Sequence, residues 1–231
     1  MVGSPAPFEA ALFDVEGTLV DCVPLQLESW RSVLAAAGFS FTHADLQPYS
    51  GMDGTWMLER LLPTQTRQTR QELLKAQGEL YRSEYLPRVQ PFPGVRELFE
   101  TLKEAGILLG VATTCQKDEL ATYDKLLRVL ELTDAIACGE MVSHGKPDPS
   151  LIEACLVQLT CSDRTRVTMI GDTPYDATAA TQLGVKPVGL LTGGFPSMAL
   201  QKSGCVAIFS QVREVGALWQ QLNKPVLRSA C

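Results

Sequence analysis

The chain has 231 residues, of which 45% are hydrophobic and 20% are charged, and its net charge is −6. This composition is that of a globular protein with a self-supporting core, and it excludes the disordered and collagen-like classes. The acidic balance excludes a general basic field for nucleic acid or an anionic membrane, so we expect any anionic ligand to be bound locally.

Cysteine usage and hydropathy favour a reducing compartment. The seven cysteines show no CxxC spacing and no accompanying histidine cluster, which predicts neither a zinc site nor a disulfide framework. No apolar run in the sequence approaches the ~20 residues needed to span a bilayer, and the first residues lack the features of a signal sequence. We therefore expect a cytoplasmic protein without a membrane partner.

The first third of the chain begins with one strand and continues in helices. The apolar run FEAALF at 8–13 predicts a buried strand. From 24 to 88 the spacing of apolar residues is helical, and the polar faces are rich in Gln, Arg and Glu. This segment is too long for an ordinary loop. We predict a helical insertion over 21–89 in a core domain formed by 1–20 and 90–231.

Apolar runs and helical patterns alternate after the insertion. The PFPGV stretch at 91–95 is suited to opening a helix over 96–106. The further expected strands are 107–113, 134–138, 166–171, 186–191 and 205–209, and the further expected helices are 117–130, 149–159, 176–183, 196–203 and 212–222. This alternation predicts parallel βαβ units and hence an α/β fold with a doubly wound sheet, in which ligands lie at the carboxyl ends of the strands.

The first predicted strand runs into the segment FDVEGTLVDC, residues 13–22, which holds two neighbouring acids. Side chains alternate along a strand, so we expect Asp14 and Glu16 to point the same way. Gly17 supplies a flexible turn whose N–H groups can approach an anion, and Thr18 supplies a hydroxyl donor. The combination predicts phosphate chemistry.

Polar groups also follow three later strands. Thr113 and Thr114 follow ILLGVA, Lys146 lies in GKPDP, and Asp172 and Asp176 lie in GDTPYD. Taken singly, each has a structural explanation, such as a helix cap for the acids or a solvated surface position for the lysine. Taken together, in order and at strand ends, they favour one catalytic site.

These motifs resemble those of the haloacid dehalogenase superfamily, whose members are mostly phosphatases. FDVEGTLVD, VATT, GKPDP and IGDTPYD are similar to its four motifs in order, and the resemblance covers nearly the whole chain. The insertion between the first two motifs is similar to the subclass that contains phosphoglycolate phosphatase and β-phosphoglucomutase. The resemblance implies a Rossmann-like core, a mobile helical cap, a Mg²⁺ cofactor and an aspartyl-phosphate intermediate. We expect a small phosphorylated metabolite as substrate, no nucleic-acid partner, and a monomer or homodimer.

The resemblance also implies roles for the acids and the lysine. Asp14 would be the nucleophile that attacks phosphorus. The Mg²⁺ ligands would be Asp14, the backbone carbonyl of Glu16, and Asp172, with Asp176 either a ligand or an orienting group. Lys146 would place a compact positive charge near both the nucleophile and the transferring phosphoryl group.

The remaining motif residues would bind that phosphoryl group. The hydroxyl of Thr113 and nearby backbone N–H groups would hold the oxygens of the phosphoryl group during its transfer, so we expect Thr113 to be a catalytic residue. Gly17, Thr18 and Thr114 are expected to contribute to binding the substrate's phosphate at the same place.

Glu16 departs from the pattern, because most phosphatases of the superfamily have Asp there to protonate the leaving group and then activate water. Glu can do both, but its extra methylene moves the carboxyl group by about a bond length, more than the ~0.5 Å within which catalytic groups are held. A first motif with Glu also resembles that of the enolase-phosphatases. Two hypotheses stay open: an active phosphatase in which Glu16 is the acid/base, and a catalytically weakened or non-catalytic binding protein of the same fold.

The stretch 50–60 resembles the part of the cap that selects the substrate. Gly51 is similar to the turn before a short cap helix, and Trp56 suggests a partly apolar lining, although this spacing is more typical of the cap's own core. The Arg with which β-phosphoglucomutase-like proteins hold a second phosphate is missing near Gly54, which disfavours a mutase. Phosphonatases use a cap lysine, whereas Lys75 lies in a charged helix, and the Gly-Thr turn disfavours a dehalogenase.

Overall fold

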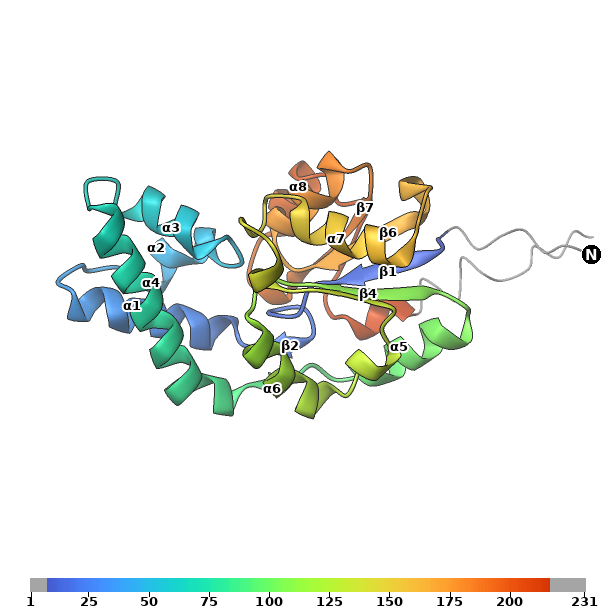
Figure 1. The fold of residues 1–231 in the computed structure, drawn as a ribbon, viewed down its shortest axis with the longest axis horizontal. Helices are drawn as coiled ribbons and strands as arrows, with labels where there is room; N and C mark the ends of the chain where they lie inside the picture. The colour runs from blue at the N-terminus through green and yellow to red at the C-terminus, as the bar shows by residue number, and fades with distance from the viewer. Residues whose placement is uncertain (1–7, 217–231) are drawn as a thin grey trace, which may run out of the picture.

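The computed structural model describes residues 8–216, and a six-stranded parallel sheet lies at its centre (Figure 1). Its strands are β1 (Ala10–Phe13), β4 (Leu108–Ala112), β5 (Ala135–Ala137), β6 (Val167–Gly171), β7 (Lys186–Leu190) and β8 (Ala207–Phe209). Their spatial order is β5-β4-β1-β6-β7-β8. The sheet therefore grows in both directions from β1, which confirms the predicted doubly wound α/β fold and makes the carboxyl end of β1 the switch point where ligands bind.

Helices cover both faces of this sheet. They are α5 (Val95–Glu104), α6 (Lys117–Leu127), α7 (Ser150–Leu159), α8 (Pro174–Gln182) and α9 (Ser197–Lys202). Ala11 and Phe13 of β1 belong to one hydrophobic cluster with α5 and α6, whereas Ala10 and Leu12 belong to another with α7 and α8. Because neighbouring side chains of a strand point to opposite faces, a strand buried on both faces reads as the continuous apolar run seen at 8–13.

The predicted helical insertion forms a separate group of helices beside the carboxyl end of the sheet (Figure 1). It contains α1 (Val23–Ala36), α2 (His43–Leu46), η1 (Gln47–Tyr49), α3 (Gly54–Leu61), α4 (Arg67–Leu80), η2 (Tyr81–Tyr85) and η3 (Leu86–Arg88). Asp53 and Thr66 cap α3 and α4, because each side chain accepts backbone N–H groups of the first turn. A hydrophobic cluster distinct from those of the sheet holds α1 to α4 together and includes Leu34, Met52 and Leu58, whereas Tyr81 of η2 and Leu86 of η3 belong to a cluster of the sheet.

Two very short strands connect this helical group with the sheet. Val20–Asp21 (β2) pairs antiparallel with Gln90–Pro91 (β3). Sequence analysis predicted neither strand, because two residues carry no periodicity and proline is untypical of a strand interior. The pair lies at the predicted boundaries of the insertion; the division into domains itself stays a prediction. The remaining short helical turns are η4 (Leu130–Leu132), η5 (Gly139–Met141), η6 (Arg164–Arg166) and η7 (Leu191–Gly193).

The expected carboxyl-terminal helix is described only in part. Residues 213–216 are helical, and the rest of the predicted range 212–222 lies outside the described residues. The six cysteines within the described part of the chain are free thiols. Among the helices of residues 8–216, none is long and apolar enough to cross a membrane.

Candidate active site

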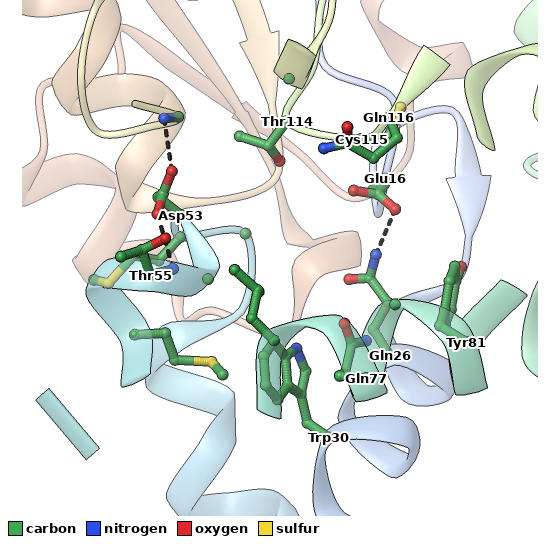
Figure 2. A pocket seen from close by; sticks show the side chains of 18 of the residues that line it. Glu16, Gln26, Trp30, Asp53, Thr55, Gln77, Tyr81, Thr114, Cys115 and Gln116 are labelled. Atoms are coloured by element: carbon green, nitrogen blue, oxygen red, sulfur yellow. Dashed lines mark hydrogen bonds between the residues drawn. The ribbon is translucent and has the colours of Figure 1, made fainter. Parts of the chain in front are cut away.

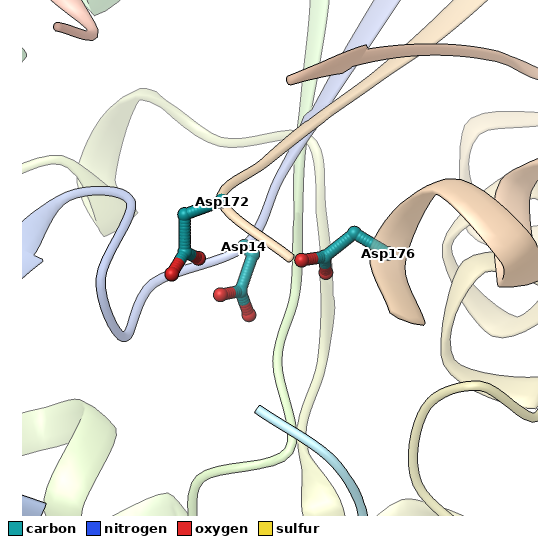
Figure 3. Close-up of side chains that lie close together, drawn as sticks. All are labelled: Asp14, Asp172 and Asp176. Carbon is teal, nitrogen blue, oxygen red and sulfur yellow. The ribbon is translucent and has the colours of Figure 1, made fainter. Parts of the chain in front are cut away.

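Four segments of the chain bring the predicted polar groups to one edge of the sheet. Asp14, Thr113 and Asp172 follow β1, β4 and β6, while Lys146 lies between β5 and α7 and Asp176 lies in the first turn of α8. Parallel strands end at the same edge, so these groups meet at the switch point. Figure 3 shows the three aspartate carboxylates turned toward a common space, and one oxygen of each lies within 4.8 Å of the others.

Lys146 lies between two of these carboxylates. Its Nζ is 2.5 Å from Oδ1 of Asp14 and 2.6 Å from Oδ1 of Asp176, and only 2% of the residue is exposed. Burial lowers the pKa of Lys146, but Asp14 and Asp176 outweigh that effect and raise it above the ordinary value. Burial raises the pKa of Asp14 to about 6, against the lowering effect of Lys146. The ammonium therefore fixes one oxygen of Asp14 in place.

Asp172 carries an oxygen that nothing in the described structure satisfies. Its Oδ1 accepts a hydrogen bond of 2.9 Å from the hydroxyl of Thr18, whereas its buried Oδ2 has no hydrogen-bond partner among the described residues. Burial, together with Asp14 and Asp176, holds the pKa of Asp172 well above its usual range. A buried, unpaired carboxylate oxygen is costly, and a hard divalent cation would satisfy it.

The first motif's turn approaches Asp172 so closely that only glycine fits. Gly17 has a φ of +80°, and a Cβ at this position would lie 2.2 Å from Oδ2 of Asp172. Only glycine accepts both this positive φ and the close approach to Asp172 without strain. Thr18 follows this turn, is fully buried and orients Asp172 through its hydroxyl hydrogen bond. The turn residues thus shape the carboxylate site.

Asp176 differs from the other two aspartates, because both of its oxygens are already in use. Oδ1 accepts from Lys146, and Oδ2 accepts from the backbone N–H and the hydroxyl of Thr173 at 3.1 and 2.6 Å, which closes the capping box of α8. Of the two roles expected for Asp176, the contacts favour orienting Lys146 over binding a cation. Asp14 and Asp172 remain as the carboxylates whose oxygens fit a divalent cation.

The Glu16 carboxylate is held by a pair of donors from two different helices. Its Oε1 accepts a hydrogen bond from Nε2 of Gln26 on α1 at 2.5 Å (Figure 2). The same oxygen accepts from the hydroxyl of Tyr123 on α6 at 3.0 Å. The hydroxyls of Tyr123 and Tyr81 are in turn 2.7 Å apart. The helical group and the core therefore both position Glu16.

The side chain of Glu16 does not join the aspartate cluster, although alternation along the strand led us to expect one common direction. The strand ends at Phe13, so its alternation does not extend to residue 16. Burial raises the pKa of Glu16 to about 8, with further contributions from Glu119 and Asp14. The hydrogen bonds of the Glu16 carboxylate go to Gln26 and Tyr123, and Glu16 is not part of the cluster formed by Asp14, Asp172 and Asp176.

The helical group contacts the core beside Lys146. The backbone N–H of Asp53 donates to the carbonyl of Lys146 at 2.9 Å, and the Asp53 carboxylate accepts the N–H of Gly145 at 2.8 Å. Gly51, with a φ of +76°, packs on Thr173, because a Cβ there would lie 2.6 Å from Cγ2 of Thr173. The expected turn at Gly51 is thus at the contact between the two parts.

A cavity of about 410 Å³ opens between the helical group and the carboxyl edge of the sheet (Figure 2). Glu16, Gln26, Gly51 and Thr114 are among the residues that line it. Thr113 is fully buried, and its hydroxyl accepts the N–H of Cys115 at 3.3 Å. The volume of the cavity is typical of a binding site for a small molecule.

Trp56, for which a partly apolar lining or a place in the cap's own core was expected, is not among the residues that line this cavity. The Trp56 ring instead stacks on His144, with centroids 5.5 Å apart and planes inclined by 21°. The tryptophan that lines the cavity is Trp30 on α1. Both tryptophans occur in helical segments, and the sequence pattern does not distinguish the face toward the cavity from the face toward the core.

Sequence analysis did not identify four residues that shape the site: Gln26, Asp53, Tyr81 and Tyr123. Asp53 stands directly before a helical pattern, so it could have been identified as an N-cap. Its contact with Gly145, 92 positions away, has no local signal. The other three lie in ordinary helical patterns and also lack one.

Comparison with known proteins identifies the class. The chain belongs to the haloacid dehalogenase-like hydrolase family, whose model matches residues 11–190. It is 31% identical over 191 residues to a phosphoglycolate phosphatase of Agrobacterium fabrum, which covers 79% of this chain and 80% of the relative. A phosphorylated carbohydrates phosphatase of Thermotoga maritima is 26% identical, with 87% and 93% covered. The crystal structure of a hydrolase from Pseudomonas syringae superposes with a TM-score of 0.85 at 25% identity, covering 94% of this chain and all of that one. The resemblance identified from the motifs is confirmed.

Proposed function

We propose that the protein is a Mg²⁺-dependent phosphatase that hydrolyses a small phosphate monoester through an aspartyl-phosphate on Asp14. The observation that carries the proposal is the unsatisfied buried oxygen of Asp172 beside the Asp14–Lys146 pair. This arrangement suits a cation next to a carboxylate nucleophile. The phosphatase names of the two relatives support the reaction class.

Lys146, Asp14 and Glu16 would carry out the formation and hydrolysis of the acyl phosphate. Lys146 fixes one oxygen of Asp14, and the other would attack phosphorus, so that an Asp14–phosphorus bond forms and the bond to the substrate's alcohol oxygen breaks. Glu16 would give its proton to that oxygen and then take a proton from the water that hydrolyses the acyl phosphate. Mg²⁺ bound by Asp14, Asp172 and the Glu16 carbonyl would supply charge neutralisation between the two anions.

The contacts of Glu16 favour turnover over a binding role. Gln26 and Tyr123 both hold Oε1, so Oε2 is available for the leaving-group oxygen or a water molecule. A longer acid needs a reshaped environment, and this donor pair supplies one. Thr113, Thr114 and the Gly17 turn are proposed to bind the oxygens of the phosphoryl group.

We assign residues 21–89 the role of a cap domain on a core domain formed by 1–20 and 90–231. The helical group has its own hydrophobic cluster, and it contacts the core through separate hydrogen bonds such as those of Asp53. Such an arrangement suits opening for entry of a small phosphorylated metabolite and closure to exclude water.

The direct test is phosphate release from p-nitrophenyl phosphate by the purified protein. With Mg²⁺ present we expect turnover, and chelation by EDTA should reduce the rate by more than about tenfold because the two anions then repel each other. Restoring Mg²⁺ in excess should restore the rate. No turnover with Mg²⁺, or turnover indifferent to EDTA, would refute the proposal.

A second experiment concerns Asp53, which joins the helical group to the Lys146 loop. We expect Asp53→Ala to lower kcat/KM by about tenfold because both the α3 cap and the contact with Gly145 are lost. Loss of the cap should also cost about 1 kcal/mol of stability, measured by denaturant unfolding.

The matched control is Asp163→Ala. Asp163 caps η6 through the N–H of Thr165, just before β6 and at the opposite edge of the sheet. Its replacement should cost a similar amount of stability without lowering kcat/KM. Equal losses of activity in the two variants would show that Asp53 acts only through stability.

A further inference from the structure

We propose that the non-phosphate part of the substrate is uncharged and rich in hydroxyl groups, as in a sugar or polyol monophosphate, and that the ion pair between Arg82 and Glu119 makes the cavity reject a second anionic group. This inference rests on the proposed function, because it concerns the substrate of the same site. It is carried by the charges and hydrogen-bonding groups of the cavity.

The described cavity lining offers no unpaired cation. Its only positive side chains are Lys75 and Arg82. Lys75 lies 3.8 Å from Glu79, and 77% of its side chain is exposed, so it extends to solvent. Arg82 Nη1 lies 3.3 Å from Oε1 of Glu119, which is itself buried. A second anion of the substrate would be desolvated in this cavity without a partner, and such burial is unfavourable.

The local backbone holds Arg82 in this pair. Arg82 lies in η2, the π-helical turn that follows α4, and its guanidinium reaches Glu119 on α6 of the core. A Cβ at Gly78 would lie 3.2 Å from Nη1 of Arg82, so the missing side chain makes room for the guanidinium. Glu119 is fixed as well, because its Oε2 accepts the N–H of Gln116 in the capping box of α6.

A long, positively charged side chain would not fit at position 54 of the cavity lining either. A Cβ at Gly54 would lie 2.6 Å from Cδ1 of Leu74 and 3.5 Å from the ring of Trp30. Leu74 and Trp30 therefore occupy the space that a longer side chain would need. Arg60, on the same helix as Gly54, is not among the residues that line the cavity, and its Nη1 lies 3.5 Å from Sδ of Met52.

Neutral hydrogen-bonding groups and aromatic rings, among them that of Trp30, line the cavity (Figure 2). Gln26 donates its amide hydrogen to Glu16, and Gln77 donates to Ser29 at 2.8 Å, which leaves both amide oxygens to accept from hydroxyl groups. Trp30 lies beside them and offers a flat apolar surface for the face of a sugar ring. These features fit a polyhydroxylated molecule.

The test compares kcat/KM for glucose 6-phosphate and phosphoglycolate in the wild type and in Glu119→Gln. Gln can still close the capping box, but it no longer neutralises Arg82. We expect the wild type to prefer glucose 6-phosphate by about tenfold or more, and the variant to shift this ratio about fivefold toward phosphoglycolate. A wild type that prefers phosphoglycolate, or an unchanged ratio in the variant, would overturn the proposal.

Glu100→Gln is the matched control, because it removes a carboxylate from a surface pair with Arg96 on α5. It should leave the substrate ratio unchanged. Calorimetric binding to Asp14→Asn separates this inference from the proposed function. If the wild type releases no phosphate from p-nitrophenyl phosphate, the proposed phosphatase function is refuted. The affinities of Asp14→Asn still decide the inference: tighter binding of glucose 6-phosphate than of phosphoglycolate supports it, and the reverse overturns it.

Discussion

Replacement of Asp14 by Asn should reduce phosphate release by about four orders of magnitude or more, because a neutral amide cannot form the acyl phosphate. The fold should persist, since Asn keeps the size of the side chain and Lys146 keeps its contact with Asp176 at 2.6 Å. The measurements are kcat/KM with p-nitrophenyl phosphate and the thermal unfolding midpoint of both proteins.

The matched control is Asp21→Asn, which makes the same chemical change in the same motif at an exposed side chain. Its kcat/KM should stay within about twofold of the wild type. Acid quenching during turnover of a phosphate-labelled substrate should leave label on the wild type and on Asp21→Asn, but none on Asp14→Asn. A fully active Asp14→Asn protein would exclude Asp14 as the nucleophile.

The acid cluster could be predicted from the sequence because of where its members lie along the chain. Asp14 follows the apolar run FEAALF and Asp172 follows VTMIG, and parallel strands of a doubly wound sheet end at one edge. The sheet itself was predictable for the same reason, because strands buried on both faces give continuous apolar runs. The β2–β3 pair was not, since two residues give no pattern.

The surroundings of Glu16 could not be predicted, because they depend on how the helices pack. Tyr123 lies 107 positions from Glu16 and Gln26 only 10, yet both donate to the same oxygen. Each lies in a helical pattern that is equally compatible with a solvated face. The same holds for Trp30 and Trp56: both lie in helical segments, and the spacing does not show which of them lines the cavity.

Glu16→Asp should lower kcat/KM for an alkyl phosphate such as glucose 6-phosphate by about 100-fold, although Asp is usual at this position in the superfamily. The shorter side chain withdraws the carboxyl group by about a bond length from Gln26 and Tyr123, whose hydrogen bonds now measure 2.5 and 3.0 Å. The acid would then be misplaced relative to the leaving-group oxygen.

A comparison of two leaving groups shows whether Glu16 acts as the acid. The p-nitrophenolate anion leaves without protonation, so Glu16→Asp should lower kcat/KM for p-nitrophenyl phosphate much less than for glucose 6-phosphate. Glu104→Asp, the same change at an exposed residue near the end of α5, should leave both values unchanged. Equal losses for the two substrates would assign Glu16 a structural role.

The outcome also decides how the departure from Asp is accommodated. If Glu16→Asp retained full activity, the donor pair of Gln26 and Tyr123 would be irrelevant to the position of the acid. If it lost activity selectively with the poor leaving group, the length of Glu16 and the placement of these donors would be matched to each other. Since Gln26 belongs to the helical group and Tyr123 to the core, that match would require both parts to be in contact when the proton is transferred.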